Sequence, residues 1–452
     1  MSSKSERPNI RVEPPGPKSK TMTDREKKVM TPAHYHYLPI AIDRGELMTV
    51  QDVDGNRYID FTSGAAVMGV GYRHPMVVEA LKSQLDKLVS HSLFFGTFEP
   101  LVKLSEKVKE LIPWSSLKDG KLAYGASGSE AVEIALWLVR RSRRLVVLAL
   151  FPSYHGRTLA ANSLTGMKSA WRKNTLPLAP GVVHAPYPYC YRCPFKLEYP
   201  DCEMACVSYI ESMLDMLVPP EDVGAFIMEP LGGSGGYQVP PAEYVPAVKK
   251  ICEKHDINFI ADEIQTGFGR TGRMFAMEHW GVEPDLATIG KALGGGIPIG
   301  ATIAKKEMMD TWEAGGWGST FGGNTLAAVA GHATISLIQE ERLDRNAAKM
   351  GEYLTDGLKG MMERRESIGD VRGKGLMLAF ELVKNRKTKE PFSEAARQIV
   401  QRSMKKGLLV STCGTYGNVI RLLPPLNIGE ETAKQALETL EESVRETESS
   451  IK

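Results

Sequence analysis

Residues 259–292 read FIADEIQTGFGRTGRMFAMEHWGVEPDLATIGKA, and the two ends of this stretch decide the fold prediction. An apolar run that begins at Ile257 has strand-like composition and ends at Asp262. A second apolar run, residues 286–289, is followed closely by Lys291. Open α/β sheets place their ligands beyond the carboxyl ends of their strands. We therefore predict that a carboxylate and an amine face one cavity.

A buried lysine near neutral pH pairs with a carboxylate, loses its proton, or forms a Schiff base with a carbonyl group. Spacing alone favours a structural salt bridge between Asp262 and Lys291. The flanking residues change this interpretation, since the chain carries DEIQTGFGRTG from residue 262 and TIGKALGGGIP from residue 288. Both segments resemble the cofactor-binding region of the class III aminotransferases, pyridoxal-phosphate (PLP) enzymes of fold type I.

The resemblance implies roles for three residues. Lys291 would hold the cofactor as a Schiff base and would carry a proton once substrate displaces it. Asp262 would keep the pyridine nitrogen protonated, so that the ring can accept the electrons of a carbanion. Gln265 would hydrogen-bond the phenolic oxygen of the cofactor.

Two further motifs match the family. In GASGSEAVEIAL, small residues precede a helical pattern, where backbone N–H groups and the helix dipole favour a phosphate. An ordinary serine cap would explain that motif if it stood alone, but the resemblance assigns Gly128 and Ser129 to the phosphate. In PSYHGRT, Tyr154 would stack on the cofactor ring, and Arg157 would reach a carboxylate at the far end of the substrate.

The expected substrate residues are Glu229, Ser234, Arg421 and Ala65. Arg421 matches the carboxylate-binding arginine of the family. Ser234 replaces a glutamate that neutralises this arginine in the ornithine and 4-aminobutyrate enzymes. An uncompensated arginine prefers a carboxylate ligand in both half-reactions, which favours α-amino acids. Ala65 stands where ornithine enzymes carry tyrosine, so we expect a roomier pocket.

Four of the six cysteines, Cys190, Cys193, Cys202 and Cys206, lie within YCYRCPFKLEYPDCEMAC. A structural Zn²⁺ site, an iron–sulfur cluster, disulfides and reduced thiols are all open interpretations. Some animal 4-aminobutyrate aminotransferases hold an iron–sulfur cluster with one cysteine pair, but their pattern lacks the second pair found here. Disulfides are less expected in a cytoplasmic protein.

The composition fits a globular enzyme with an extensive core. The chain has 452 residues, and 56 Lys and Arg against 54 Asp and Glu give a formal net charge of +2. This balance does not favour nucleic-acid or membrane binding. The polar, proline-rich start lacks an apolar signal region, and no apolar run reaches the length of a spanning helix. We expect a cytoplasmic protein.

The resemblance implies an α/β fold of type I: a large domain with a mainly parallel seven-stranded sheet, and a smaller α+β domain. We expect an N-terminal segment over 1–75 that contributes to the small domain, the large domain over 76–330, and the small domain over 331–452. Residues 1–30 are expected to form a surface arm or disordered tail. Thr320 would reach the phosphate of a neighbouring subunit, which implies a homodimer or a dimer of dimers.

The expected function is PLP-dependent transamination between an amino acid, either an ω-amino acid such as 4-aminobutyrate or ornithine or an α-amino acid, and a 2-oxo acid such as 2-oxoglutarate. Some relatives return the proton to the α-carbon instead, so an amino-acid racemase or epimerase on the same scaffold is the alternative. A binding protein that has lost catalysis is disfavoured by the intact Lys291, Asp262 and Thr320.

Overall fold

The computed structural model describes residues 7–451, and these fall into two compact units. Unit 1 combines the chain up to Pro75 with Arg345–Lys452, and unit 2 is Met76–Asp344. No helix within the described residues is both long enough and apolar enough to cross a membrane.

Unit 2 extends further along the chain than the boundary that we expected after residue 330. That position falls inside the helix α10 (Thr325–Glu340), which belongs to unit 2 because it packs against α4 (Glu99–Leu111) and the short helix η7 (Lys291–Gly294).

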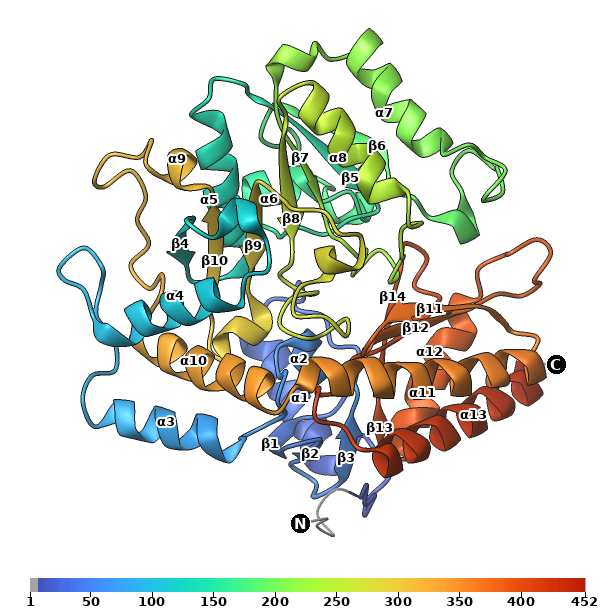
Figure 1. Ribbon diagram of the computed structural model, residues 1–452. Helices are drawn as coiled ribbons and strands as arrows, with labels where there is room; N and C mark the ends of the chain where they lie inside the picture. The colour runs from blue at the N-terminus through green and yellow to red at the C-terminus, as the bar shows by residue number, and fades with distance from the viewer. Residues whose placement is uncertain (1–6, 452) are drawn as a thin grey trace. The chain divides into compact units, whose positions relative to one another are not determined.

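Unit 2 is built around a seven-stranded sheet with the order β4-β10-β9-β8-β7-β5-β6 (Figure 1). β10 pairs antiparallel with both of its neighbours, and the other strands share one direction. The expected mainly parallel seven-stranded sheet is therefore confirmed. Its strands are β4 (Lys121–Gly125), β5 (Val146–Phe151), β6 (Val182–Pro186), β7 (Val223–Met228), β8 (Asn258–Asp262), β9 (Leu286–Ile289) and β10 (Gly300–Ala304).

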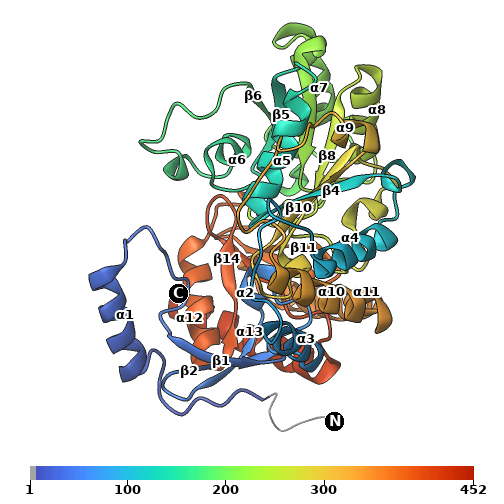
Figure 2. The same ribbon diagram turned by 90° about the vertical axis from the view of Figure 1, so that its left-hand side faces the viewer.

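Helices cover both faces of this sheet, as right-handed crossovers between parallel strands require. In Figure 2, α5 and α6 lie on one face and α8 lies on the other. Besides α4 and α10, the α-helices of this part of the chain are α3 (Pro75–Leu85), α5 (Gly128–Arg140), α6 (Leu159–Leu164), α7 (Ala205–Met216), α8 (Tyr244–Lys254) and α9 (Lys306–Met309). Its short 3-10 helices, besides η7, are η2 (Ser115–Leu117), η3 (Ser169–Trp171), η4 (Cys190–Arg192), η5 (Pro220–Asp222) and η6 (Ala276–His279).

The core of unit 2 lies between α5 and the sheet. Val132 and Leu136 of α5 pack in one cluster with Val147, Ile227 and Ile260 from the central strands. Each such side chain contributes about 1.5–3 kcal/mol when it is fully buried. Because β7 and β9 are buried along their whole length, they read as continuous apolar runs rather than as alternating patterns.

Unit 1 contains two four-stranded sheets, ordered β1-β2-β3-β13 and β11-β12-β15-β14. The Asp54-Gly55 turn closes a hairpin, because β2 and β3 pair antiparallel on either side of it. The strands are β1 (Ile42–Glu46), β2 (Thr49–Asp52), β3 (Arg57–Asp60), β11 (Ile368–Lys374), β12 (Met377–Leu382), β13 (Leu408–Leu409), β14 (Ser411–Cys413) and β15 (Val419–Leu422). The helices are α1 (Pro17–Val29), α2 (Ser63–Ala66), α11 (Leu343–Arg364), α12 (Ser393–Lys405) and α13 (Glu430–Ile451).

The helix α1 rules out one of the two alternatives that we expected for residues 1–30, a disordered tail, over Pro17–Val29. Residues 1–6 lie outside the described part. Pro17 occupies its first turn, where a proline costs nothing. The carboxylate of Asp54, in the hairpin turn, accepts the backbone N–H groups of Lys18 and Ser19, both at 2.8 Å. The cap therefore comes from a residue far along the chain, which a local reading of the sequence does not detect.

Candidate active site

The predicted cofactor residues of unit 2 follow the carboxyl ends of the parallel strands. Gly128 and Ser129 come after β4, Tyr154 after β5, Asp262 ends β8, and Lys291 follows β9. Parallel strands end at the same edge of a sheet, so these residues share that edge. The register pairs Asp262 on β8 with Thr288 on β9, three positions before Lys291.

Asp262 is held rigidly at this edge and is only 3% exposed. Its Oδ2 accepts a hydrogen bond from Nδ1 of His155 at 2.6 Å. Its Oδ1 accepts from the Thr288 hydroxyl at 3.0 Å and from the backbone N–H of Ile264 at 3.2 Å. The carboxylate is thereby fixed in orientation while its charge is kept hydrogen-bonded.

His155 and Thr288 are partners of Asp262 that the sequence analysis missed. His155 is 2% exposed and stands beside Tyr154 in the quoted PSYHGRT motif. The signal was available, because a histidine just after a strand that runs parallel to β8 lies at the same sheet edge as Asp262.

Glu263, the second member of the acidic pair, has a different environment. It is fully buried, and its carboxylate accepts the Thr266 hydroxyl and the backbone N–H of Met277, the latter at 2.9 Å. Burial raises the pKa of Glu263 to about 7, although these hydrogen bonds act in the opposite direction. Glu263 thus ties the chain after β8 to η6 inside unit 2.

The start of α5 has the form that a phosphate site requires. The Ser127 side chain caps the helix by accepting the N–H of Glu130 at 3.2 Å, and Glu130 accepts the N–H of Ala126 at 2.9 Å. These two hydrogen bonds order the turn, while Gly128 and Ser129 supply the first N–H groups of the helix. Position 156 favours glycine, because its φ is +134° and a Cβ there would lie 2.4 Å from Oγ of Ser129. The loop after β5 can therefore approach the start of α5 closely.

Glu229, which we expected to contact the substrate, uses both carboxylate oxygens within the protein. Oε1 accepts the N–H of Tyr154 at 2.8 Å, and Oε2 accepts the N–H of Gly233 at 2.9 Å. Burial raises the pKa of Glu229 to about 7, opposed by His155 and reinforced by the neighbouring Asp262. The residue thereby joins the loop after β5 to the loop after β7.

The glycine at position 233 permits a close approach to Gln265. A Cβ there would come within 2.5 Å of the Gln265 side-chain oxygen. That oxygen is buried and has no hydrogen-bond partner among residues 7–451. Ser234, the next residue, is half-buried in the same loop.

Tyr154 and Arg157 share an aromatic neighbour that the sequence analysis also missed. The rings of Tyr154 and Trp171 meet edge to face, with centroids 5.7 Å apart. The Arg157 guanidinium stacks over the same Trp171 ring at 4.1 Å from its centroid. Arg157 is exposed, so the edge of its guanidinium stays accessible to a carboxylate.

Two of the predicted substrate residues, Arg421 and Ala65, line one pocket of about 350 Å³ in unit 1. Arg421 donates from Nε to the Ser411 hydroxyl at 2.8 Å, and its guanidinium lies 5.9 Å from the ring centroid of Tyr37. Much of the remaining wall is aromatic or aliphatic, formed by Tyr35, Leu38, Ile40, Ile42, Val50, Tyr72 and Leu409.

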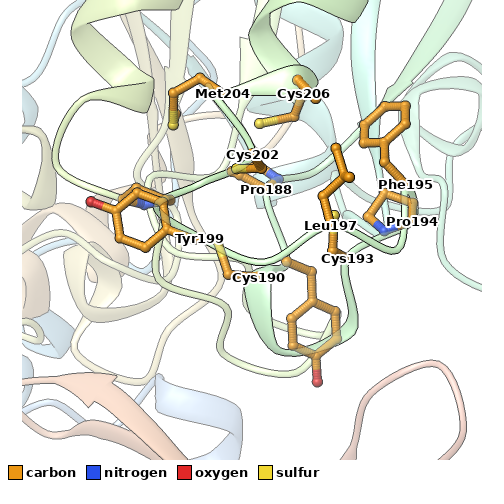
Figure 3. A pocket seen from close by; sticks show the side chains of 13 residues that line it. Pro188, Cys190, Cys193, Pro194, Phe195, Leu197, Tyr199, Cys202, Met204 and Cys206 are labelled. Atoms are coloured by element: carbon orange, nitrogen blue, oxygen red, sulfur yellow. The ribbon is translucent and has the colours of Figure 1, made fainter.

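The cysteine cluster occupies a separate part of unit 2. Cys190, Cys193, Cys202 and Cys206 all line one small pocket between β6 and α7 (Figure 3). All six cysteines of the chain fall within the described residues, and there they are thiols rather than disulfides. No three His, Cys, Asp or Glu side chains within 7–451 form a ready set of metal ligands.

A comparison with protein families decides the classification. The model of the family described as "Aminotransferase class-III" matches residues 30–444. The chain belongs to the class-III aminotransferases. The fold agrees, because the structures that it resembles are fold type I transaminases.

Among individual class-III relatives, the leucine/methionine racemase of Thermococcus litoralis is 41% identical, covering 91% of this chain and 92% of the relative. The 4-aminobutyrate aminotransferase GabT of Escherichia coli is 37% identical, covering 89% and 92%. An amine transaminase from an uncultivated Pseudomonas species, solved in its PLP-bound form, has a TM-score of 0.86 at 30% identity, covering 93% and 99%.

Class-III membership implies PLP, and features of this structure fit that group. The buried carboxylate of Asp262, held by hydrogen bonds at the end of β8, suits a protonated pyridine nitrogen. The capped start of α5 suits a phosphate group. The buried side-chain oxygen of Gln265 has no hydrogen-bond partner within the described residues, so its amide suits a polar atom of the cofactor.

Proposed function

We propose that this class-III enzyme transfers the amino group of an amino acid to a 2-oxo acid through PLP. The observation that carries the proposal is the immobilised Asp262, held by His155 and Thr288 at the sheet edge that also carries Lys291. A buried carboxylate in a fixed orientation suits a protonated ring nitrogen, whereas a purely structural salt bridge needs neither of these additional partners.

When bound, PLP supplies an electron sink for the electrons released as a bond to the substrate carbon breaks. Asp262 would accept the N–H of the ring nitrogen and keep that nitrogen protonated. Lys291 would hold the cofactor covalently and then take the proton from the carbon that bears the amino group. Gly128 and Ser129 would bind the phosphate, and the Gln265 amide would bind the phenolic oxygen.

The pocket of unit 1 supports a substrate with a carboxylate. The Arg421 guanidinium, held at Nε by Ser411, is suited to a charge-assisted pair with that group. The largely apolar wall and the small side chain of Ala65 suit an α-amino acid with a sizeable apolar side chain. We propose 2-oxoglutarate as the acceptor. Arg157, whose exposed guanidinium stacks on Trp171 within unit 2, is proposed to bind a carboxylate.

Racemisation is the second candidate, and the name of a 41% identical relative favours it specifically. Both reactions need Lys291, Asp262 and proton removal from the same carbon. They differ in where the proton returns: transamination delivers it to the cofactor, and racemisation returns it to the α-carbon.

We also propose that the working form is a dimer. Thr320 is exposed, which suits contact with a phosphate bound to a second copy. The adjacent Ser319 hydroxyl donates to Glu130 of α5 at 2.9 Å, so this segment is anchored near the start of that helix.

The decisive experiment titrates the PLP-loaded enzyme with single amino acids in the absence of any 2-oxo acid. Conversion of the lysine-bound cofactor absorbance to that of pyridoxamine phosphate, with one equivalent of 2-oxo acid released, is expected for L-leucine or L-methionine. Racemisation would instead give α-hydrogen exchange in D₂O and loss of optical rotation without net conversion. Amines that lack a carboxylate serve as the control for Arg421, and an equal response to them would remove Arg421 from the proposal.

A further inference from the structure

The cysteine segment, residues 188–206, joins β6 to α7 and is mostly irregular. Apart from η4, it consists of turns and stretches without regular secondary structure until α7 begins at Ala205. Backbone hydrogen bonds from Arg192, Lys196 and Ala205 each reach back only three residues. Such bonds shape individual turns, but they do not connect the two ends of a segment this long.

The four thiols of the segment face a common cavity of about 20 Å³ (Figure 3). A cavity of this size holds a single water-sized or ion-sized guest. The other lining side chains are apolar or aromatic, among them Phe195, Leu197 and Tyr199, and none of them is a carboxylate or an imidazole. Any ion in this cavity would therefore be bound by sulfur.

The four thiols are accessible to an ion from solvent. Cys190 is exposed, and Cys193, Cys202 and Cys206 are partly exposed. Since no three ligands among residues 7–451 already form a ready set, binding would turn these thiols from the cavity wall toward the ion.

We propose that Cys190, Cys193, Cys202 and Cys206 bind one Zn²⁺ ion as four thiolates and so tie the end of β6 to the start of α7. Four sulfur donors on one small cavity suit the tetrahedral coordination of structural zinc. The four thiols release four protons to solvent as the ion binds, with no change in oxidation state. The site is structural, and none of its ligands belongs to the residues proposed for PLP or substrate.

Metal analysis of the enzyme purified without chelator from zinc-supplemented medium tests this proposal. About one zinc ion per chain is expected in the wild type, and at least a tenfold lower content in the double variant Cys193→Ser/Cys202→Ser. The matched control is Cys252→Ser, which removes a buried thiol of α8 outside the cluster and should retain the zinc. Replacement of the zinc by Co²⁺ should give the visible absorbance of tetrahedral thiolate ligation.

A second measurement on the wild-type enzyme does not depend on the folding of any variant. Iodoacetamide should label the four cluster cysteines only after a chelator has removed the zinc, as peptide mass spectrometry would report. Three results would overturn the proposal: enzyme that carries no zinc when purified without chelator and whose four thiols react before any chelator is added, disulfides within the segment, or iron with acid-labile sulfide in place of zinc.

Discussion

At the scale of single residues, the contact between His155 and Asp262 determines how the carboxylate at the end of β8 is presented. The two side chains are almost fully buried, and their 2.6 Å hydrogen bond prevents the carboxylate from rotating freely. A charge-assisted hydrogen bond of this kind contributes about 1.5–3 kcal/mol.

We therefore expect His155→Leu to weaken PLP binding or lower kcat by about 10- to 100-fold, since 1.4 kcal/mol corresponds to a factor of ten. His155→Asn, whose amide N–H stands in for Nδ1, should retain most of the activity. PLP affinity from equilibrium dialysis and kcat measure the two effects. Equal loss in both variants would show that His155 acts through packing and not through Asp262.

The burial of Glu263 predicts that the stability of the fold depends on pH. Its pKa rises from 4.5 in an exposed carboxyl to about 7 in the fold, so the folded state holds its proton more tightly than the unfolded state. This tighter proton binding stabilises the folded state fully below about pH 4.5, and the stabilisation is lost as the pH rises through about 7.

Glu263→Gln removes the buried charge, so the variant should be more stable than the wild type at pH 8.5, by up to about 3 kcal/mol, and should lose this advantage at pH 5. Thermal unfolding midpoints at the two pH values measure the difference. Glu211→Gln on α7, where the carboxylate is exposed, should show no such crossover. A Glu263→Gln variant that is less stable at both pH values would contradict the assigned protonation.

The site residues that belong to sequence motifs could be predicted, because the residue types and their spacing along the chain indicate where they lie. Asp262 and Lys291 follow strands whose apolar composition predicts burial, and the structure brings them to one edge. Trp171 was missed because its contacts with Tyr154 and Arg157 cross loops, which no periodicity encodes. The position of His155 just after β5 was available from the sequence and was overlooked.

At the scale of elements, α1 shows how a distant residue can decide a local structure. The helix carries no side-chain cap of its own, and the two N–H groups bound by Asp54 belong to its first turn. Burial acts to raise the pKa of Asp54, but hydrogen bonds from the Ser19 hydroxyl and from the backbone N–H groups of Ser19 and Lys18 together lower it. The hairpin turn that carries Asp54 thus holds the first turn of the N-terminal helix in place.

We expect Asp54→Ala to destabilise α1 by about 0.5–2 kcal/mol, the usual cost of losing a helix cap. Hydrogen exchange of the α1 amides should accelerate, and Asp24→Ala should leave their exchange nearly unchanged, because Asp24 pairs with Lys27 on the exposed surface. Unchanged protection in Asp54→Ala would show that the cap is dispensable.

Elements with a strong local signal are accessible to sequence. The Asp-Gly pair at positions 54 and 55 is typical of a hairpin turn, and it joins β2 to β3. The domain boundary was less accessible to sequence, because α10 could pack with either unit. Its contacts with α4 and η7 assign it to unit 2.

At the scale of the whole molecule, the proposed dimer depends on an exposed apolar surface of unit 2. Phe94, Phe95 and Phe321 are 61%, 83% and 62% exposed. The Phe94 ring lies against Gly318, so these side chains come from adjoining segments next to Thr320. An exposed apolar cluster of this kind marks an interaction site.

Phe95→Asp should therefore shift the enzyme from dimer to monomer in sedimentation velocity, and it should also weaken PLP retention if Thr320 of a second copy binds the phosphate. Met216→Asp on α7, a side chain that is 81% exposed, should leave the assembly unchanged. A Phe95→Asp variant that sediments like the wild type would move the interface elsewhere.

The central claim is that Lys291 holds the cofactor at the sheet edge organised by Asp262. Borohydride reduction of the PLP-loaded enzyme, followed by peptide mass spectrometry, locates the modified lysine directly. We predict a phosphopyridoxyl group on Lys291, and none in Lys291→Ala. Modification of a different lysine, or loaded enzyme whose Lys291 remains unmodified, would contradict the proposed site.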